Sequence, residues 1–197
     1  MNPPAAVLTP DRILDAAEDV LRRFGPAKAN VVDVARALGV SHGSVYRHFP
    51  TKAALRDAVA ERWLNRVSAP LAAIAAEHGP ATGRLWRWIE ALSLAKRKKV
   101  LDDPELFATY HELSLDAREV AREHVDTLAR QAAQIIADGI ARGEFAETDP
   151  ATTARAVLNA TSRFHHPAHA AEWTEPGLED DLRAVWRLVL SGLAARA

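Results

Sequence analysis

The sequence contains no cysteine and a single methionine among its 197 residues. Without cysteine there can be no disulfide bond, no thiol nucleophile and no zinc site with cysteine ligands. No apolar run approaches the length of about 18 residues that a transmembrane helix needs. The N-terminal residues show no basic stretch followed by an apolar one, so we expect no signal peptide, no membrane partner and a cytoplasmic location.

A strong charge of either sign is also missing, since the formal net charge is −1. This balance argues against a protein coated in nucleic acid. The charges are unevenly distributed, however. Residues 1–60 hold eight Lys or Arg and six Asp or Glu, whereas the remainder holds 17 Lys or Arg and 20 Asp or Glu. The sign of this difference is typical of an N-terminal nucleic-acid-binding module joined to a different domain.

Sustained alternation of apolar and polar residues, the signal for β-strands, is absent, and Ala, Leu, Arg and Glu dominate. We therefore predict an all-α fold of about nine helices, with a three-helix domain at residues 1–55 and a larger helical domain at residues 56–197. Capping residues and Gly or Pro at helix ends predict the first three helices after Thr9, Asn30 and Ser41. Later helices are expected at 52–79 with a kink or break near Pro70, and at about 81–100, 104–112, 115–142, 150–164 and 176–195.

The segment 39–52, GVSHGSVYRHFPTK, combines a glycine, a capping serine and a short run of polar side chains. A helix-turn-helix requires a small residue where its helices touch, a glycine at the turn and apolar residues below both helices. Ala35 and Gly39 fulfil the first two requirements. The apolar set is Val34, Leu38, Val40 and Val45.

With Val45 facing the core, the other side chains of this short helix point outward. We expect His42, Ser44 and Arg47 to contact base edges in a major groove. Phosphate contacts are expected from Tyr46, His48, Thr51 and Lys52. Ser41, which caps the helix, is also counted among the DNA-binding residues. An ordinary amphipathic helix is the alternative, but it explains Val45 and Phe49 without explaining the polar outward face.

The run ILDAAEDVLRRFG…VVDVARALGVSHGSVYRHFPTKAALRDAV resembles the N-terminal domain of the tetracycline-repressor (TetR) family of transcriptional regulators. The similarity covers roughly residues 10–60, and GVSHGSVYRHFPTKAAL is specific to the family. Family members usually have Thr or Ser at both positions that open the second helix, where this chain has Ala29 and Asn30. Asn30 can still cap the helix and contact a phosphate, whereas Ala29 cannot.

The resemblance implies a repressor that binds a palindromic double-stranded operator as a homodimer through its last two helices and leaves the DNA when a small-molecule effector binds. It also implies an effector pocket in the C-terminal domain. Candidate lining residues are Trp63, Trp86, Trp88, Phe107, Tyr110, His111, Leu115 and Phe164. Aromatic residues at helical spacing fit an ordinary core as well, and a DNA-binding protein without an effector is the corresponding alternative.

The stretch FHHPAH offers His165, His166 and His169 as ligands for a transition metal, with His111 or Glu172 as a further ligand. Pro167 interrupts the helical spacing, and a helix end whose imidazoles face free carbonyls is the simpler interpretation. A histidine-ligated metal enzyme is a remaining alternative, but the chain lacks an HExxH pair and a phosphate-cradling glycine loop. We expect no enzyme and no cofactor.

The basic run KRKKV at residues 96–100 is expected to be the solvated end of a helix. A second nucleic-acid contact is the alternative interpretation.

Overall fold

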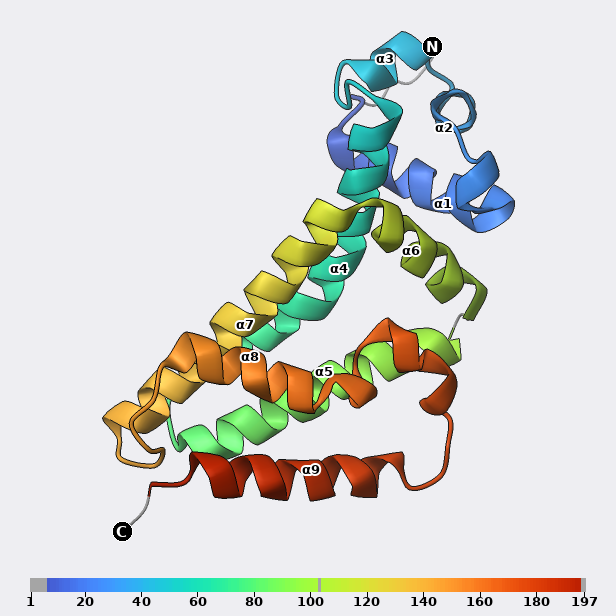
Figure 1. Ribbon diagram of the computed structural model, residues 1–197. Coiled ribbons are helices and arrows are strands. Elements are labelled where there is room, and N and C mark those ends of the chain that lie inside the picture. Colours follow the sequence, from blue (N-terminus) through green and yellow to red (C-terminus); the bar gives the residue numbers. More distant parts are fainter. Residues whose placement is uncertain (1–6, 103, 196–197) are drawn as a thin grey trace. The chain divides into compact units, whose positions relative to one another are not determined.

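The computed structural model describes residues 7–102 and 104–195, and nine α-helices account for most of these residues (Figure 1). Two short 3₁₀ helices and one isolated β-bridge, between Phe145 and Ala194, complete the regular structure of the described ranges. This confirms the all-α prediction. The elements are α1 (Pro10–Lys28), α2 (Val31–Leu38), α3 (His42–Tyr46), α4 (Lys52–Ala76), α5 (Ala81–Asp102), α6 (Pro104–Asp116), α7 (Arg118–Ala141), α8 (Pro150–Ala160), η1 (Ser162–Phe164), η2 (Pro167–Glu172) and α9 (Leu178–Leu193).

The chain forms two compact units. The first comprises the chain up to Trp63 together with Glu105–Ala121, and the second comprises Leu64–Pro104 together with the chain from Arg122 onward. Helices α4 and α7 therefore contribute residues to both units. The functional domains expected at residues 1–55 and 56–197 stay a prediction.

The first unit contains the three N-terminal helices, and their apolar faces form its core. Thr9 caps α1 by accepting a hydrogen bond from the Arg12 amide at 3.3 Å. The Gly-Pro signal at Gly25 and Pro26 predicts the end of the first helix. Instead, α1 kinks at Gly25, where φ is 71° and ψ is 168°, and continues to Lys28. The buried apolar residues of α1 to α4 in this unit are Ile13, Leu14, Ala17, Val20, Leu21, Val31, Val34, Ala35, Val45, Leu55, Val59, Ala60 and Trp63.

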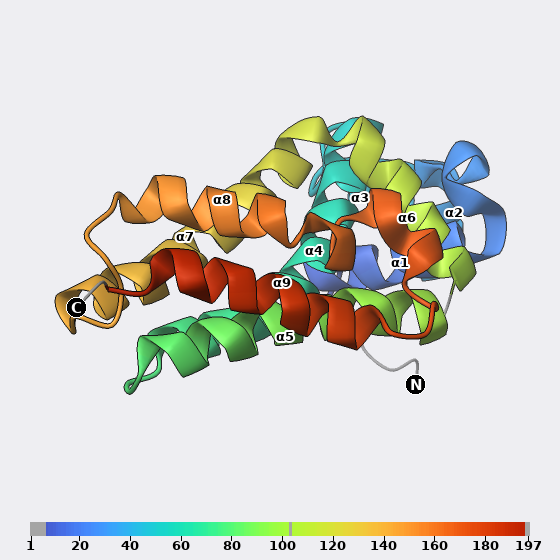
Figure 2. The ribbon, with the colours of Figure 1, turned by 60° about the horizontal axis from the view of Figure 1, so that its bottom comes forward.

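In the second unit α9 lies alongside α5 and α8 (Figures 1 and 2). The ring of Trp86 on α5 lies 5.7 Å from the ring of Trp186 on α9. The interior is apolar, and its largest fully buried side chains are Leu71, Leu85, Trp88, Ile89, Leu92, Ile135, Ile136, Phe164 and Trp173. No helix of the described ranges is long and apolar enough to cross a lipid bilayer.

Several helix ends differ from the sequence-based expectation. Helix α4 continues through Pro70, which is exposed, so that the missing proline amide affects the solvent side of the helix. Helix α6 extends to Asp116, beyond the expected residue 112, because Leu113 is 1% exposed and Ser114 donates a hydrogen bond to the Tyr110 carbonyl. Helix α8 ends at Ala160, where the Thr161 hydroxyl donates to the Val157 carbonyl and η1 follows.

Candidate nucleic-acid interface

The turn between α2 and α3 depends on Gly39, whose backbone lies in the left-handed region at φ 67° and ψ 30°. This conformation favours glycine because it has no Cβ. The Gly39 amide donates to the Arg36 carbonyl at 3.1 Å, and the Val40 amide donates to the Ala35 carbonyl at 3.0 Å. These bonds satisfy the last carbonyls of α2, so that only three residues are needed between the end of α2 and the start of α3.

Helix α3 is anchored by one apolar side chain, since Val45 is 0% exposed. Ser41 caps the helix by accepting a hydrogen bond from the Ser44 amide at 3.2 Å. The side chains of His42, Tyr46 and Arg47 are exposed. A helix of only five residues therefore presents nearly all of its polar groups to solvent.

The outward face of α3 is held together by its own side chains. The hydroxyls of Ser41 and Ser44 are 2.9 Å apart, and Nη2 of Arg47 donates to Oγ of Ser44 at 3.2 Å. The His42 ring meets the Tyr46 ring edge-on, at a centroid distance of 6.3 Å. The guanidinium of Arg47 is thus held along the helix, which the sequence alone did not predict.

Residues on either side of α3 supply hydrogen-bonding groups next to helix N-termini. Asn30 Oδ1 accepts from the Asp33 amide at 3.0 Å, which leaves its Nδ2 donors for another acceptor. Thr51 Oγ1 accepts from the Ala54 amide at 2.9 Å, and Lys52 is the exposed first residue of α4. Such helix starts favour an anion because their free amides point outward.

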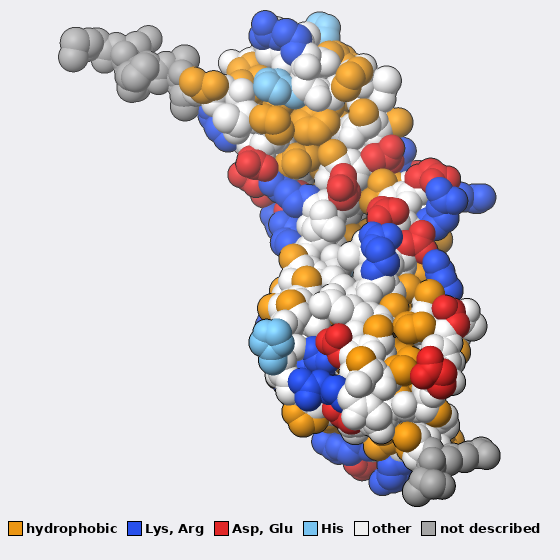
Figure 3. Space-filling view, turned by 90° about the vertical axis from the view of Figure 1, so that its left-hand side faces the viewer, with side chains coloured by type: hydrophobic (Ala, Val, Ile, Leu, Met, Phe, Trp, Pro, Cys, Tyr) orange, Lys and Arg blue, Asp and Glu red, His pale blue; other side chains and the backbone are white. Residues whose placement is uncertain are grey.

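The segment that contains α3 has basic residues but no acidic ones. Residues 39–52 contain Arg47, Lys52 and two histidines but no Asp or Glu. Figure 3 shows Lys, Arg and His side chains at the top of the view, which is the end of the first unit that carries α3. Eight of the nine predicted DNA-contacting side chains are exposed, and the ninth, Ser44, is half-buried.

Four of the eight predicted effector-lining residues form an aromatic cluster in the first unit. The Trp63 ring stacks on the Tyr110 ring at 4.8 Å, with an interplanar angle of 8°. The Phe107 ring lies 6.1 Å from Trp63 and 6.3 Å from His111. Trp63, Phe107 and Tyr110 are buried and His111 is half-buried.

The ring contacts of this cluster do not include the other four candidates. Trp88 is 0% exposed in the second unit and donates its indole N–H to Gln131, and half-buried Trp86 packs on Trp186. Phe164 is buried beneath the Arg163 guanidinium. Leu115 is 61% exposed, because α6 continues past its expected end and turns Leu113 inward instead. The assignment of the eight residues to an effector pocket stays a prediction.

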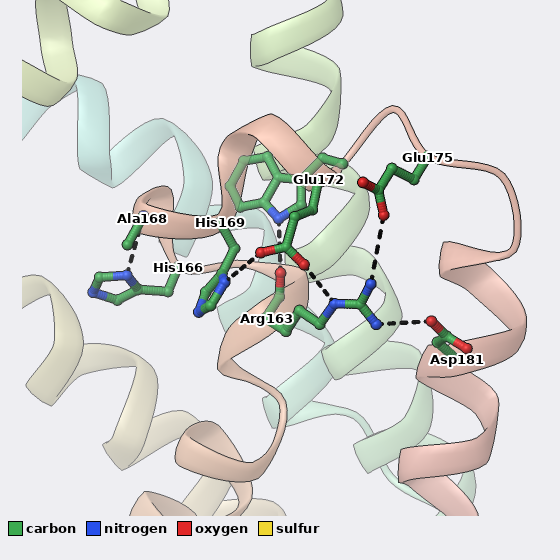
Figure 4. A network of polar contacts seen from close by, with 8 residues as sticks. Arg163, His166, Ala168, His169, Glu172, Glu175 and Asp181 are labelled. Atoms are coloured by element: carbon green, nitrogen blue, oxygen red, sulfur yellow. Dashed lines mark hydrogen bonds and ion pairs between the residues drawn. The ribbon is translucent and has the colours of Figure 1, made fainter.

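The three histidines of the predicted metal site have three different partners. His165 Nε2 lies 3.2 Å from the Thr161 hydroxyl, and His166 Nδ1 accepts from the Ala168 amide. Figure 4 shows His169 turned toward Glu172, at 2.8 Å, while the other oxygen of that carboxylate accepts from Arg163. No group of three or more His, Asp or Glu side chains suited to a metal ion occurs in the described ranges. The geometry gives the predicted metal site no support.

The basic run at residues 96–100 is not the solvated helix end that the sequence predicts. Lys96 is only 4% exposed, and its Nζ lies 3.5 Å from His124 Nε2. Sequence reasoning missed this contact because the two residues lie 28 positions apart on different helices. Lys98 is the one exposed residue of this described run, and it pairs with Asp102.

Two family descriptions match the sequence. "Bacterial regulatory proteins, tetR family" matches residues 13–59, and "Tetracyclin repressor-like, C-terminal domain" matches residues 81–186. An HTH-type transcriptional regulator of Mycobacterium tuberculosis (strain ATCC 25618 / H37Rv) is 40% identical over 60 residues. These residues are 30% of this chain and 30% of that protein, so the chain matches less than a third of this relative's length.

Solved structures show that the fold is shared. The transcriptional regulator FadR from Bacillus subtilis, in complex with stearoyl-CoA, has a TM-score of 0.66 at 19% identity, covering 94% of this chain and 100% of that chain. SmeT, the repressor of the Stenotrophomonas maltophilia multidrug efflux pump SmeDEF, has a TM-score of 0.65 at 19% identity. The similarity covers 95% of this chain and 91% of that chain. Because the C-terminal family match alone extends over more than half of the sequence, and the N-terminal match includes the helix-turn-helix, this chain belongs to the TetR family.

Proposed function

We propose that this protein is a sequence-specific DNA-binding transcriptional repressor that binds a palindromic operator as a homodimer and leaves it when a small-molecule effector binds. The observation that carries the proposal is α3, a five-residue helix anchored by Val45 with its polar side chains turned to solvent. Such a helix adds little to a hydrophobic core, because only Val45 of its side chains is buried. A major groove offers hydrogen-bonding partners for each of its outward groups.

Within this proposal His42, Ser44 and Arg47 contact base edges. Arg47 is suited to a guanine because its planar guanidinium can donate two parallel hydrogen bonds. Asn30, Ser41, Tyr46, His48, Thr51 and Lys52 contact phosphates and fix the position of α3 in the groove.

A homodimer through α8 and α9 is part of the proposal, since a single helix of this length reads too few base pairs. Leu188 on α9 is 75% exposed, and its helical neighbours Val185 and Val189 are half-buried. On α8, the small side chains of Ala156 and Ala160 are exposed. Exposed apolar and small side chains on these two helices support close packing against a second copy of the same helices.

Effector binding is proposed for the C-terminal part of the chain. The similarity in fold to FadR, whose structure contains stearoyl-CoA, supports this assignment without identifying the effector. By thermodynamic reciprocity, an effector that weakens operator binding must itself bind more weakly to the DNA complex. A cytoplasmic protein without enzymatic activity is consistent with this function.

Selection of random DNA by the purified protein tests the proposal. We expect enrichment of one sequence with two inverted half-sites whose centres lie about one helical turn of DNA, or a multiple of it, apart. Recovery of no common sequence, or of an unpaired single site, would contradict sequence-specific binding by a symmetric dimer.

A further inference from the structure

Helices α5 and α9 lie side by side in the second unit, and two contacts join their facing sides (Figures 1 and 2). The Trp86 ring on α5 packs on the Trp186 ring on α9 at 5.7 Å. Further along α5, Arg97 donates to Glu179 at 3.1 Å. The helices are therefore antiparallel. Between the two contacts their side chains leave a groove of about 170 Å³.

The apolar part of the groove comes from both helices. Leu178 and Leu182 of α9 line it and are 4% and 5% exposed. Buried Ser93 of α5 faces them, and its short side chain leaves the space between the helices unfilled. Half-buried Trp86 and Leu94, which is 51% exposed, complete the α5 side. A small apolar molecule can remove these surfaces from water without displacing either helix.

One charged group of the groove has no counter-ion. Arg97 is paired with Glu179. Arg183, on the other side of the groove, is paired with Asp180 at 3.0 Å. Glu90 is half-buried and makes no ion pair or side-chain hydrogen bond with the described part of the chain. The two arginines and their acids cancel, so the remaining charge is that of the Glu90 carboxylate.

The position of Glu90 relates this charge to the apolar surface. Trp86, Glu90 and Leu94 follow one another at intervals of four residues and therefore lie along one face of α5. A carboxylate that is partly removed from water and has no partner gains more from a bound cation than a fully hydrated one does. The groove thus offers an anionic group between an indole ring and a leucine.

A second hollow, of about 430 Å³, adjoins the groove near the start of α9. The two share four lining residues, so a molecule can approach the groove through the hollow. Three carboxylates line this hollow against two guanidinium groups, namely Glu175, Glu179, Asp180, Arg97 and Arg183. The approach therefore also favours a cation over an anion.

The groove lies away from the proposed dimer contact. Glu179 and Leu188 are nine residues apart on α9, which is about two and a half helical turns, so they project from opposite sides of the helix. Glu179 lines the groove, whereas Leu188 is exposed. A second copy bound at Leu188 would leave the groove open.

We propose that this groove binds a primary ammonium compound with an aromatic body, its ammonium donating to the Glu90 carboxylate and its ring packing against Trp86 and Leu94. The inference rests on the proposed function, because it assigns arylalkylamines as the effector class. An organic anion would be repelled by Glu90, and a neutral molecule would leave it without a partner. A ligand held by both helices can change the position of α9, which carries the proposed dimer contact.

Isothermal titration calorimetry on the full chain at pH 7 tests the site with three amines, each compared with the alcohol of the same skeleton. The pairs are benzylamine and benzyl alcohol, 2-phenylethylamine and 2-phenylethanol, and tryptamine and tryptophol. We expect at least one amine to bind about tenfold or more tightly than its alcohol, since only the ammonium can pair with the carboxylate. Glu90→Gln keeps the size of the side chain and should abolish the preference. Glu147→Gln, exposed in the same unit outside the groove, is the matched control and should leave it unchanged.

Tryptophan fluorescence gives a readout at the groove itself. The amine that binds most tightly should change the emission of the wild type, and Trp86→Phe should lose most of this change. Trp63→Phe, which alters a tryptophan of the first unit, should keep it. If no amine binds more tightly than its alcohol, if Glu90→Gln keeps the preference, or if Trp86→Phe keeps the full emission change, the assignment is wrong.

Operator binding separates this proposal from the proposed function. Operator release by a neutral or anionic compound but by none of the three amines overturns the amine effector and leaves the regulator intact. Amine binding with the expected preference in a protein that selects no DNA sequence overturns the regulator and leaves the amine site intact.

Discussion

Arg47 and Lys52 are both exposed cations near α3, but they differ in setting. Arg47 is held along the helix by Ser44, on the face that we assign to base edges. Lys52 begins the next helix, where the amides of the first turn favour an anion. The two residues therefore test different parts of the proposed interface.

Arg47→Ala should weaken binding to the selected operator by about 1–3 kcal/mol and affect random DNA much less, because it removes a base contact. Lys52→Ala should weaken binding to both DNAs alike and reduce the slope of log affinity against log salt by about 1, because it removes a phosphate contact. Fluorescence anisotropy with the two duplexes between 50 and 200 mM salt measures both effects. Equal losses of affinity for operator and random DNA in Arg47→Ala would show that Arg47 does not read bases.

The buried imidazole of His124 should make the free energy of unfolding depend on pH. Its imidazole stays neutral in the folded protein, since its pKa is lowered from 6.5 to about 3, whereas the unfolded chain binds a proton there below about pH 6.5. Stability should therefore fall as the pH falls from about 6.5, by up to about 1.4 kcal/mol per pH unit from this residue. Urea unfolding at pH 7 and pH 5 should show a smaller loss for His124→Gln than for the wild type. Identical losses would mean that His124 is not held neutral by burial.

Some residue roles could be predicted from the sequence and others could not. The caps at Thr9, Asn30 and Ser41 depend on neighbours within three positions, so local pattern was sufficient. Lys96 lies in a run of charges that is typical of a solvated helix end. Its burial depends on contacts between separate helices, which no local pattern contains.

At the level of elements, the turn between α2 and α3 permits a matched pair of glycine substitutions. A Cβ on Gly39 would meet nothing within 4 Å. Gly39→Ala therefore destabilises the fold only through the strain of an alanine in the left-handed backbone region. We expect a destabilisation of about 1–2 kcal/mol. Gly43→Ala, within α3 and with its nearest contact at 3.8 Å, should instead stabilise by about 0.5–1 kcal/mol through helix propensity. Denaturant unfolding compares the two variants, and a stabilised Gly39→Ala would disprove the proposed role of the turn.

The existence of the helices was predictable, while their ends were less so. The end of α6 depends on which residues find a core to pack against: Leu113 is buried, whereas Leu115 is exposed. Both are leucines at plausible helical positions, so only the tertiary structure distinguishes them. The same reason explains why some predicted effector residues, such as Trp63, are buried, whereas Leu115 is exposed.

At the level of the whole molecule, Leu188 is exposed in a single copy but would be buried in the interface of the proposed dimer. Leu188→Glu should place a charge in the interface, convert the dimer into a monomer and weaken operator binding by a factor on the order of 100, because the half-sites are then bound separately. Sedimentation velocity and anisotropy measure the two effects. The control is Leu101→Glu, which alters a leucine of similar exposure, 54% against 75%, on α5. A dimeric Leu188→Glu variant would exclude this part of α9 from the interface.

The buried ammonium of Lys96 has a consequence for laboratory evolution. Its lowered pKa means that the folded protein disfavours its charged form, which is the form present at neutral pH. Replacing Lys96 by an apolar residue of similar length should therefore raise the melting temperature. Random variants selected for heat resistance alone should then include changes at this position. Such variants should still bind the operator, since Lys96 is not among the proposed DNA contacts.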